Sequence, residues 1–363
     1  MSNYLWFERN KAVLPPSKLH IEGNHFVNEA GQAIPLRSQS FFLGLLRMSL
    51  GEDIRDQMRY ARDIAGSNCL RTFILMHYVP AQNGLPDVTH IRALDYLDQY
   101  LELAAEEGLY VDLTVGDAQV LLPNLPHQQD FFWQVYSIMK RHNNAALLTL
   151  NEPWKNGLDA YRSLPFGITN IIRSRGAGYD EHSHYMPPLD VISAHTERSL
   201  GDDGYKWVRH QWEQHDYMSV PVYHEEPIGC AEYQQDGKRD NSPERFAQGA
   251  IVGEVAGAGW CFHCEFGIHG YLPAEGSNQD RCAHAVGDAR RWFKPETQRW
   301  AWTRSGWGDS ALVLDDAHAL RVYQRLGASE GQIVAVHSQN YVAVAQNGWH
   351  ITAQNGAFID VAR

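Results

Sequence analysis

The sequence predicts an α/β fold, a (β/α)8 barrel preceded by a hairpin and followed by a small antiparallel β-appendage. Strand-like apolar runs alternate with helix-like segments through most of the 363 residues, and strands joined by helical crossovers are parallel. A barrel of this kind routinely uses about 250 residues or more as one unit. After about residue 300 the pattern changes to short alternating strands with Asn-Gly turns, which are typical of hairpins. We therefore expect a barrel domain over residues 1–298 and a β-rich domain over residues 299–363.

The first half of the chain opens with a predicted hairpin, because apolar and polar residues alternate on both sides of Gly23-Asn24. We expect this hairpin to cap another element. Strands and helices then alternate, and the helix beginning at Ile91 has apolar residues near the 3.6-residue period. The predicted elements are strand 34–46, helix 53–65, strand 69–76, helix 91–107, strand 109–115, helix 129–141 and strand 145–150.

The second half continues the same alternation after a long loop. Residues 157–188 are rich in Gly, Pro, Ser and His, and loops that follow barrel strands lie at the face where ligands bind. An eight-stranded barrel needs a fifth strand here, and Gly167–Ile172 is the only candidate. The other predicted elements are strand 189–194, helix 205–215, strand 220–223, helix 243–255, strand 259–262 and helix 281–292.

Charge and hydropathy exclude two classes of partner. The net charge is −12 without clustered Lys or Arg, whereas nucleic-acid binding needs a concentrated basic face. No apolar run approaches the roughly 18 residues of a membrane span, and residues 1–9 lack the features of a signal peptide. We expect no nucleic acid and no membrane as partners. A cytoplasmic or virion-associated protein fits, as does a secreted one whose signal has been removed.

The five cysteines are an odd, sparse set that fits free thiols better than a disulfide framework. Cys261-Phe262-His263-Cys264, with Cys282 and His284 nearby, allows a zinc interpretation. An extended strand, however, points residues three apart to opposite faces. We therefore expect neither a metal nor an organic cofactor.

Two carboxylates at predicted strand ends suggest paired acid chemistry. Asn151-Glu152-Pro153 follows the apolar run 145–150, and His224-Glu225-Glu226-Pro227 follows the run 220–223. Cleaving a glycosidic bond needs one carboxylic acid to protonate the leaving oxygen and one carboxylate to attack or to activate water. A like charge nearby raises the pKa of the acid and keeps it protonated near neutral pH. Glu152 and Glu226 are therefore the catalytic candidates, and a carbohydrate is the expected substrate.

With these motifs the chain resembles clan A of the retaining glycoside hydrolases, over roughly residues 19–295. Asn151-Glu152 is similar to the acid/base motif of that clan, with Asn151 expected to bind the sugar 2-hydroxyl. The run 69–73 resembles the second strand, whose arginine, here Arg71, steadies the nucleophile. The run 190–195 resembles the sixth strand, where His195 would line the site. The resemblance implies that Glu152 is the acid/base and that Glu226, five positions after a proline, is the nucleophile.

The chain departs from the clan pattern at two places. Glu197 stands where many members of the clan have a tyrosine that binds the nucleophile. Glu265, in Cys264-Glu265-Phe266-Gly267, also resembles the end of a nucleophile strand and competes with Glu226. Glu225 is a further alternative, although on a regular strand it would face away from Glu226.

Other residues at strand ends are candidates for substrate binding. Trp260 could stack on a sugar ring, with core packing as the equal alternative. His195 could likewise be a buried core histidine. The remaining candidates follow predicted strand ends and could instead be ordinary loop packing: His77, Asp117 and Trp154.

Two other functions remain open at this stage. A glycan-binding barrel without catalysis would share the fold, and only the presence of both carboxylates speaks against it. A metal-dependent barrel enzyme would need convergent His, Asp or Glu ligands at the strand ends, and the sequence shows no convincing set.

Overall fold

A computed structural model describes most of the barrel and the strands that follow it. The described ranges are 13–116, 118–151, 157–159, 162, 172–177, 190–195, 220–226, 229–230, 243, 246, 250 and 259–292, with the strands 301–305, 309–315, 318–324, 331–335, 350–354 and 357–362 described as backbone.

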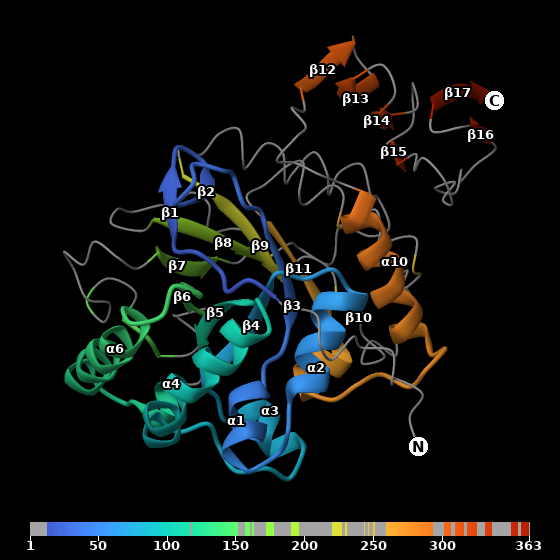
Figure 1. The fold of residues 1–363 in the computed structure, drawn as a ribbon. Helices are drawn as coiled ribbons and strands as arrows, with labels where there is room; N and C mark the ends of the chain where they lie inside the picture. Colours follow the sequence, from blue (N-terminus) through green and yellow to red (C-terminus); the bar gives the residue numbers. More distant parts are fainter. Residues whose placement is uncertain are drawn as a thin grey trace.

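Eight parallel strands close into a ring, which confirms the (β/α)8 prediction (Figure 1). Each strand pairs with its neighbour in chain order, and the last, β11, pairs with both β9 and β3. The ring consists of β3 (Leu36–Ser40), β4 (Cys69–Leu75), β5 (Tyr110–Val115), β6 (Ala145–Leu150), β7 (Ile172–Ala177), β8 (Val191–His195), β9 (Val222–Glu226) and β11 (Gly259–Cys264). The short strand β10 (Gly229–Cys230) pairs with the end of β11.

Two predicted strands are placed differently in the structure. The fifth barrel strand is Ile172–Ala177, not Gly167–Ile172, and it pairs with β6 through Leu147↔Ile172. Its sequence, IRSRGA, has a single large apolar residue, so backbone pairing within the ring defines this strand better than hydropathy does. The predicted strand 34–46 ends at Ser40 and is followed by helix α1 (Gly44–Ser49).

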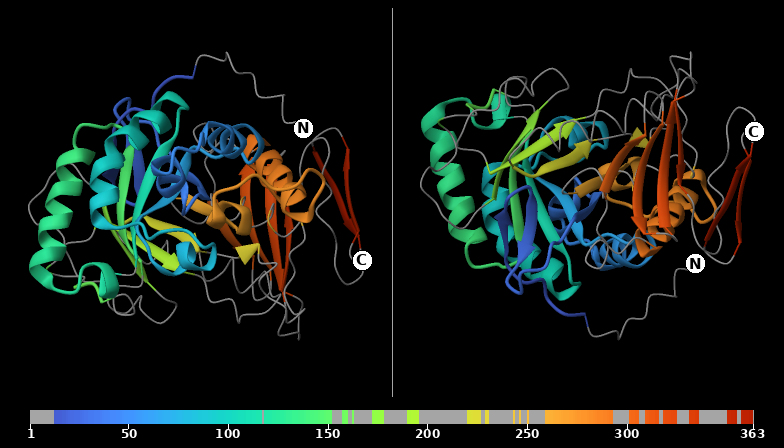
Figure 2. Two further views of the ribbon diagram at one scale, coloured as in Figure 1. Left: turned by 90° about the horizontal axis from the view of Figure 1, so that it is seen from below. Right: turned by 90° about the horizontal axis from the view of Figure 1, so that it is seen from above.

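Helices cover the outside of the barrel, with α4 and α6 on one side and α10 on another (Figure 2). Polar side chains cap two of them: Thr89 accepts from the Arg92 N–H at the start of α4, and Asn124 accepts from the His127 N–H at the start of α6. The described helices are α1, α2 (Arg55–Arg59), the π-helix η1 (Tyr60–Ile64), α3 (Tyr78–Gln82), α4 (His90–Glu106), α5 (Ala118–Leu121), α6 (Leu125–Met139), α9 (Glu265–His269) and α10 (Asn278–Trp292).

The predicted helix 53–65 is present as α2 followed directly by η1. In the predicted helix 243–255, the described residues Pro243, Phe246 and Ala250 are helical. The predicted helix 205–215 lies outside the described residues. None of the described helices is long and apolar enough to cross a membrane.

The N-terminal hairpin caps the end of the barrel opposite the strand ends that carry the candidate site. Its strands β1 (Leu19–Glu22) and β2 (His25–Asn28) are antiparallel, as predicted. Leu19 and Phe26 are buried against Leu36, Cys69 and Tyr110, which stand at the beginnings of barrel strands. The hairpin therefore closes the amino-terminal end of the barrel with apolar side chains.

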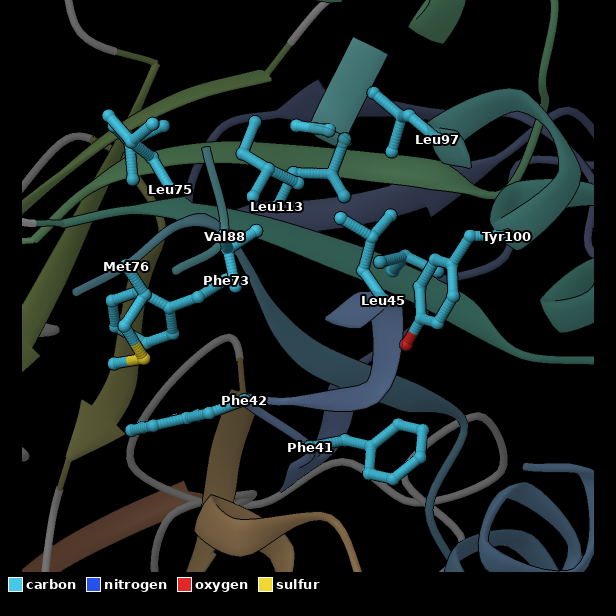
Figure 3. Packing of buried hydrophobic residues seen from close by; sticks show 14 of the residues in the cluster. Phe41, Phe42, Leu45, Phe73, Leu75, Met76, Val88, Leu97, Tyr100 and Leu113 are labelled. Carbon is cyan, nitrogen blue, oxygen red and sulfur yellow. The ribbon is translucent and has the colours of Figure 1, made fainter. Parts of the chain in front are cut away.

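The main core lies between the barrel strands and the helices outside them. Figure 3 shows Leu97 and Tyr100 of α4 close to Leu45 of α1. The Tyr100 hydroxyl lies 2.6 Å from the Thr72 hydroxyl, so Thr72 faces the helix layer. Because the side chains of a strand alternate between faces, the neighbouring Arg71 faces the interior of the barrel.

The C-terminal strands are antiparallel, as predicted. One sheet contains β12 (Ala301–Ser305), β13 (Asp309–Asp315), β14 (His318–Gln324) and β15 (Gly331–Ala335). A separate antiparallel pair contains β16 (His350–Gln354) and β17 (Ala357–Ala362). The Asn355-Gly356 turn expected from the sequence lies outside the described residues.

Candidate active site

Arg71 is the centre of the candidate site. It stands on the second barrel strand, β4, and its side chain is fully buried. The guanidinium lies near two aromatic rings, 4.9 Å from the centroid of Phe42 and 5.3 Å from that of Phe73. Such contacts favour a cation in a desolvated position.

Three residues from two other strand ends bind the Arg71 guanidinium. Nη1 donates to Glu226 Oε1 at 2.6 Å, and Nη2 donates to Asn151 Oδ1 at 2.9 Å. Nε lies 2.5 Å from Glu225 Oε1. The planar guanidinium carries its N–H groups in a fixed geometry. Arg71 therefore fixes the positions of two side chains relative to each other: Asn151, after the fourth strand, and Glu226, on the seventh.

A register shift in β9 explains why both glutamates reach the same arginine. Ala194 of β8 pairs with His224, but the next residue, His195, pairs with Glu226. Glu225 is thus the extra residue of a β-bulge, which interrupts the alternation of side chains between faces. The prediction that Glu225 faces away from Glu226 is therefore wrong: both carboxylates contact Arg71.

The two carboxylates differ in their access to solvent. The Glu225 side chain is fully buried, whereas that of Glu226 is 16% exposed. Of the two glutamates, Glu226 is therefore the one that solvent reaches.

A third carboxyl group, Asp112 of β5, lies deeper in the barrel. Burial and the nearby charge of Glu225 raise the pKa of Asp112 to about 8, although Arg71 and a hydrogen bond from Thr149 oppose the shift. The Thr149 hydroxyl donates to Asp112 Oδ1 at 2.7 Å. At neutral pH, Asp112 therefore holds a proton and adds no charge to the site.

The charges around Arg71 keep it a cation. Burial alone lowers the pKa of Arg71, but the neighbouring acidic groups, above all Glu225 and Glu226, outweigh that effect and raise it. One buried cation thus faces the carboxyl groups of both glutamates.

His263 of β11 is a barrel-interior residue that we did not predict as a candidate. Its Nδ1 lies 2.9 Å from the Ser40 hydroxyl, and its ring centroid is 5.6 Å from that of Phe42, which also contacts Arg71. The alternation of side chains along β11 could have identified His263 from the sequence. Alternation along Cys261-Phe262-His263 places His263 on the face of Cys261, whose Sγ lies 3.8 Å from the same Ser40 hydroxyl.

Trp260 lies on the opposite face of β11 from His263. Its ring is fully buried, and the Arg290 guanidinium of α10 lies 5.6 Å from the ring centroid. Arg290 also donates to the Trp260 carbonyl at 3.0 Å. The structure thus places Trp260 in the core between barrel and helix, as the packing alternative predicts.

Two further candidates stand at the rim, each bound to a neighbouring side chain. His77, after β4, has a side chain that is 44% exposed, and its Nδ1 lies 2.8 Å from Asp87 Oδ1. Glu265, directly after β11, lies 3.0 Å from His269 Nε2. Glu265 therefore has a different partner from the carboxylates that meet at Arg71.

Four of the residues singled out in the sequence lie outside the described residues: Glu152, Trp154, Asp117 and Glu197. His195 is described only as backbone, where it pairs with Glu226 at the end of β8. This register places the sixth-strand histidine position beside the candidate nucleophile.

The zinc interpretation of Cys261-Phe262-His263-Cys264 finds no support in the geometry. Cys261 faces Ser40 inside the barrel, whereas Cys264 alternates to the other face of β11. Within the described ranges no group of three or more His, Cys, Asp and Glu residues could hold a metal ion. The cysteines whose side chains are described are all buried: Cys69, Cys261, Cys264 and Cys282.

Comparison with known proteins gives matches of structure but not of sequence. No protein-family model and no curated protein matches the chain. Among solved structures, a glycoside hydrolase family 5 protein from Bacteroides vulgatus is similar with a TM-score of 0.60 and 14% identity, covering 86% of this chain and 82% of that one. A β-glucanase from Saccharophagus degradans, solved in complex with cellotetraose, is similar with a TM-score of 0.54 and 13% identity. The match covers 77% of this chain and 96% of that one.

An exo-β-1,4-mannosidase from an Opitutaceae bacterium is also similar, with a TM-score of 0.52 and 11% identity, covering 75% of this chain and 61% of that one. At such identities the likeness concerns the fold. The chain therefore has the (β/α)8 barrel fold that these glycoside hydrolases share.

Proposed function

We propose that this protein is a retaining glycoside hydrolase with Glu226 as nucleophile and Glu152 as acid/base. The observation that carries the proposal is the bridge formed by Arg71, which donates to both Asn151 and Glu226. Asn151 directly precedes Glu152 in the chain. The bridge therefore joins the strand ends that carry the two proposed catalytic residues.

The proposed reaction has two displacements at the anomeric carbon. In the first, a Glu226 oxygen forms a bond to that carbon while the glycosidic C–O bond breaks, and Glu152 gives its proton to the departing oxygen. In the second, Glu152 takes a proton from water. The water oxygen then attacks the same carbon, the ester to Glu226 breaks, and the sugar leaves with its original configuration.

The surroundings of Glu226 support the nucleophile role. Its carboxylate is partly exposed at the carboxyl end of β9, and one oxygen is held by Arg71. In (β/α)8 enzymes the active site lies at this end of the strands. The similar solved structures named as a β-glucanase and an exo-β-1,4-mannosidase suggest gluco- and manno-configured β-linked glycans as the first substrates to test.

Hydrolysis of a panel of such oligosaccharides and aryl glycosides tests the proposal. We expect wild-type turnover, and a loss on the order of 10⁴-fold or more in Glu226→Gln. Glu265→Gln is the matched control, because Glu265 directly follows the neighbouring strand β11 and is bound to His269 instead of Arg71. The anomer first released, followed by NMR, should have the configuration of the substrate.

Other results would support the alternatives. Oligosaccharide binding without turnover would favour a glycan-binding barrel, and activity lost on chelation and restored by a divalent metal would favour a metal-dependent enzyme. If Glu265→Gln lost much more hydrolytic activity than Glu226→Gln, the nucleophile would be Glu265, directly after the eighth strand.

A further inference from the structure

Glu225 is a buried carboxylate that the proposed mechanism does not use. Its side chain is fully buried, and Oε1 lies 2.5 Å from Arg71 Nε. The Thr114 hydroxyl lies beside this contact: it accepts from Arg71 Nε at 3.3 Å and donates to Glu225 Oε1 at 3.5 Å. Glu225 is thus bound to the same guanidinium that orients Glu226.

The contacts of Arg71 show what Glu225 does to the guanidinium. Nε is occupied by Glu225, Nη1 by Glu226 and Nη2 by Asn151. An arginine that faces a single carboxylate prefers a bidentate contact, with two parallel N–H···O bonds. Glu225 contacts the Nε edge and thereby fixes the plane of the guanidinium, while Nη1 donates to Glu226 and Nη2 donates to Asn151.

Charge gives Glu225 a second effect. Arg71 divides its positive charge between two carboxylates, so Glu226 is bound less tightly than by an arginine with one partner. A carboxylate held by a full, unshared cation is more stable and a poorer nucleophile. Among the described residues, the other titratable groups that interact electrostatically with Glu225 or Arg71 are Asp112 on β5, Tyr223 on β9 and Cys261 on β11.

Asp112 and Cys261 carry no charge below neutral pH. Burial raises the pKa of the Cys261 thiol to about 12, and Asp112 is protonated below about pH 8. Glu225 and Glu226 are the carboxyl groups in direct contact with the Arg71 guanidinium, so the group that offsets Arg71 beside Glu226 is Glu225.

We propose that Glu225, placed by the β-bulge, is a positioning residue of the active site: it fixes and partly neutralises Arg71 so that Glu226 is held in one orientation and stays nucleophilic. This inference rests on the proposed glycosidase function and assigns no contact with the substrate to Glu225. The bulge is essential to it, since a regular β9 would turn one of the two glutamates away from Arg71.

The pH dependence of kcat/KM in Glu225→Gln tests the inference. Glutamine can still accept from Arg71 Nε but has no charge, so Arg71 would hold ionised Glu226 more strongly. We expect the acid limb to move to lower pH by about one unit and kcat to fall about tenfold or more, with a smaller change in KM. A purely structural role would lower stability without moving the acid limb.

Asp112→Asn is the matched control. It replaces another buried carboxyl of the same barrel interior, but one that is protonated in the acidic range. We expect its acid limb to coincide with that of the wild type. A shift in Asp112→Asn as large as that in Glu225→Gln would overturn the specific role of Glu225.

Thr114→Val keeps the inference testable if Glu225→Gln does not fold, as judged by thermal unfolding. It removes the hydroxyl that contacts both Arg71 and Glu225 but keeps the Glu225 carboxyl, so we expect kcat to fall about threefold or more and the acid limb to stay in place. Wild-type kcat in Thr114→Val would then overturn the inference. A folded Glu225→Gln with wild-type kcat and acid limb would do the same, whereas a wild type without glycosidase activity would overturn the proposed function itself.

Discussion

Arg71 on the second barrel strand donates to Glu226 on the seventh over 2.6 Å, although 155 residues separate them in the chain. The contact exists because the carboxyl ends of parallel barrel strands meet at one face. The same arginine also holds Asn151 and Glu225. One buried cation therefore organises the polar groups of the candidate active site.

Substitution of Arg71 should be costly because it leaves buried carboxylates without a cation. We expect Arg71→Met to lower the free energy of unfolding, measured in urea, by about 3–5 kcal/mol. The double variant Arg71→Met/Glu225→Leu should regain most of that loss, since it removes the stranded charge. It should remain inactive, because Glu226 and Asn151 have lost their common donor.

A surface ion pair serves as the control for this effect. Arg141 and Asp98 are paired at 2.6 Å with side chains that are 51% and 47% exposed. Arg141→Ala should change stability by about 1 kcal/mol or less. An Arg71→Met variant as stable as Arg141→Ala would contradict the central role of Arg71 in the core.

Asp112 should make the protein less stable as the pH rises. Its pKa is raised from 3.8 to about 8 in the folded chain, so between these values the folded state holds a proton that the unfolded state has released. The free energy of unfolding then falls with increasing pH, by up to about 1.4 kcal/mol per unit. Above about pH 8 the contribution of Asp112 no longer changes.

The difference in stability between wild type and Asp112→Asn isolates this contribution. Asparagine can keep the hydrogen bond from Thr149 and does not titrate. We expect the free energy of unfolding of the variant, measured in urea, to rise steadily relative to that of the wild type from about pH 4 to pH 8. A difference independent of pH would show that Asp112 is ionised in the folded protein.

The barrel-interior cysteines should be inert to alkylation in the native state. Burial raises the pKa of Cys261 to about 12 and that of Cys69 further, and the thiolate is the reactive form. A short iodoacetamide pulse at pH 8, followed by peptide mass spectrometry, should leave both unlabelled. The same pulse in denaturant should label both, and rapid native labelling of Cys261 would contradict its burial beside Ser40.

The separation of the two proposed catalytic carboxyl groups distinguishes the mechanisms. A crystal structure should show Glu152 and Glu226 about 5–5.5 Å apart at the mouth of one pocket, as in retaining enzymes. A separation of about 6.5–9.5 Å would indicate an inverting enzyme, in which a water molecule fits between the two groups. Carboxyl groups that open into different pockets would contradict a glycosidase.

Much of the barrel could be predicted because the alternation of strands and helices is a local property of the sequence. The predicted strand ends placed Asn151 and Glu226 at one face, and the clan resemblance added Arg71. The fifth strand was placed too early in the chain because its sequence, IRSRGA, has one large apolar residue and is held in the ring by pairing with β6. Hydropathy carries little information about such a strand.

The relation between Glu225 and Glu226 was predicted wrongly for a related reason. Strict alternation assumes a regular strand, and a bulge depends on the pairing between β8 and β9, which no local pattern in β9 records. The sequence allows Trp260 either to stack on a sugar or to pack in the core, and the choice depends on the position of Arg290 in the closed fold. The partners of buried polar groups come from distant segments, so their geometry follows only from the closed fold.

The most direct test of the account is to trap the glycosyl-enzyme intermediate. A 2-deoxy-2-fluoro glycoside with a good leaving group, chosen from the sugar that the wild type hydrolyses, forms the first covalent bond quickly and loses it slowly. Peptide mass spectrometry then identifies the modified residue. The account predicts one sugar esterified to Glu226 and none in Glu226→Gln, whereas a sugar on Glu225 or Glu265, or turnover without any covalent adduct, would contradict it.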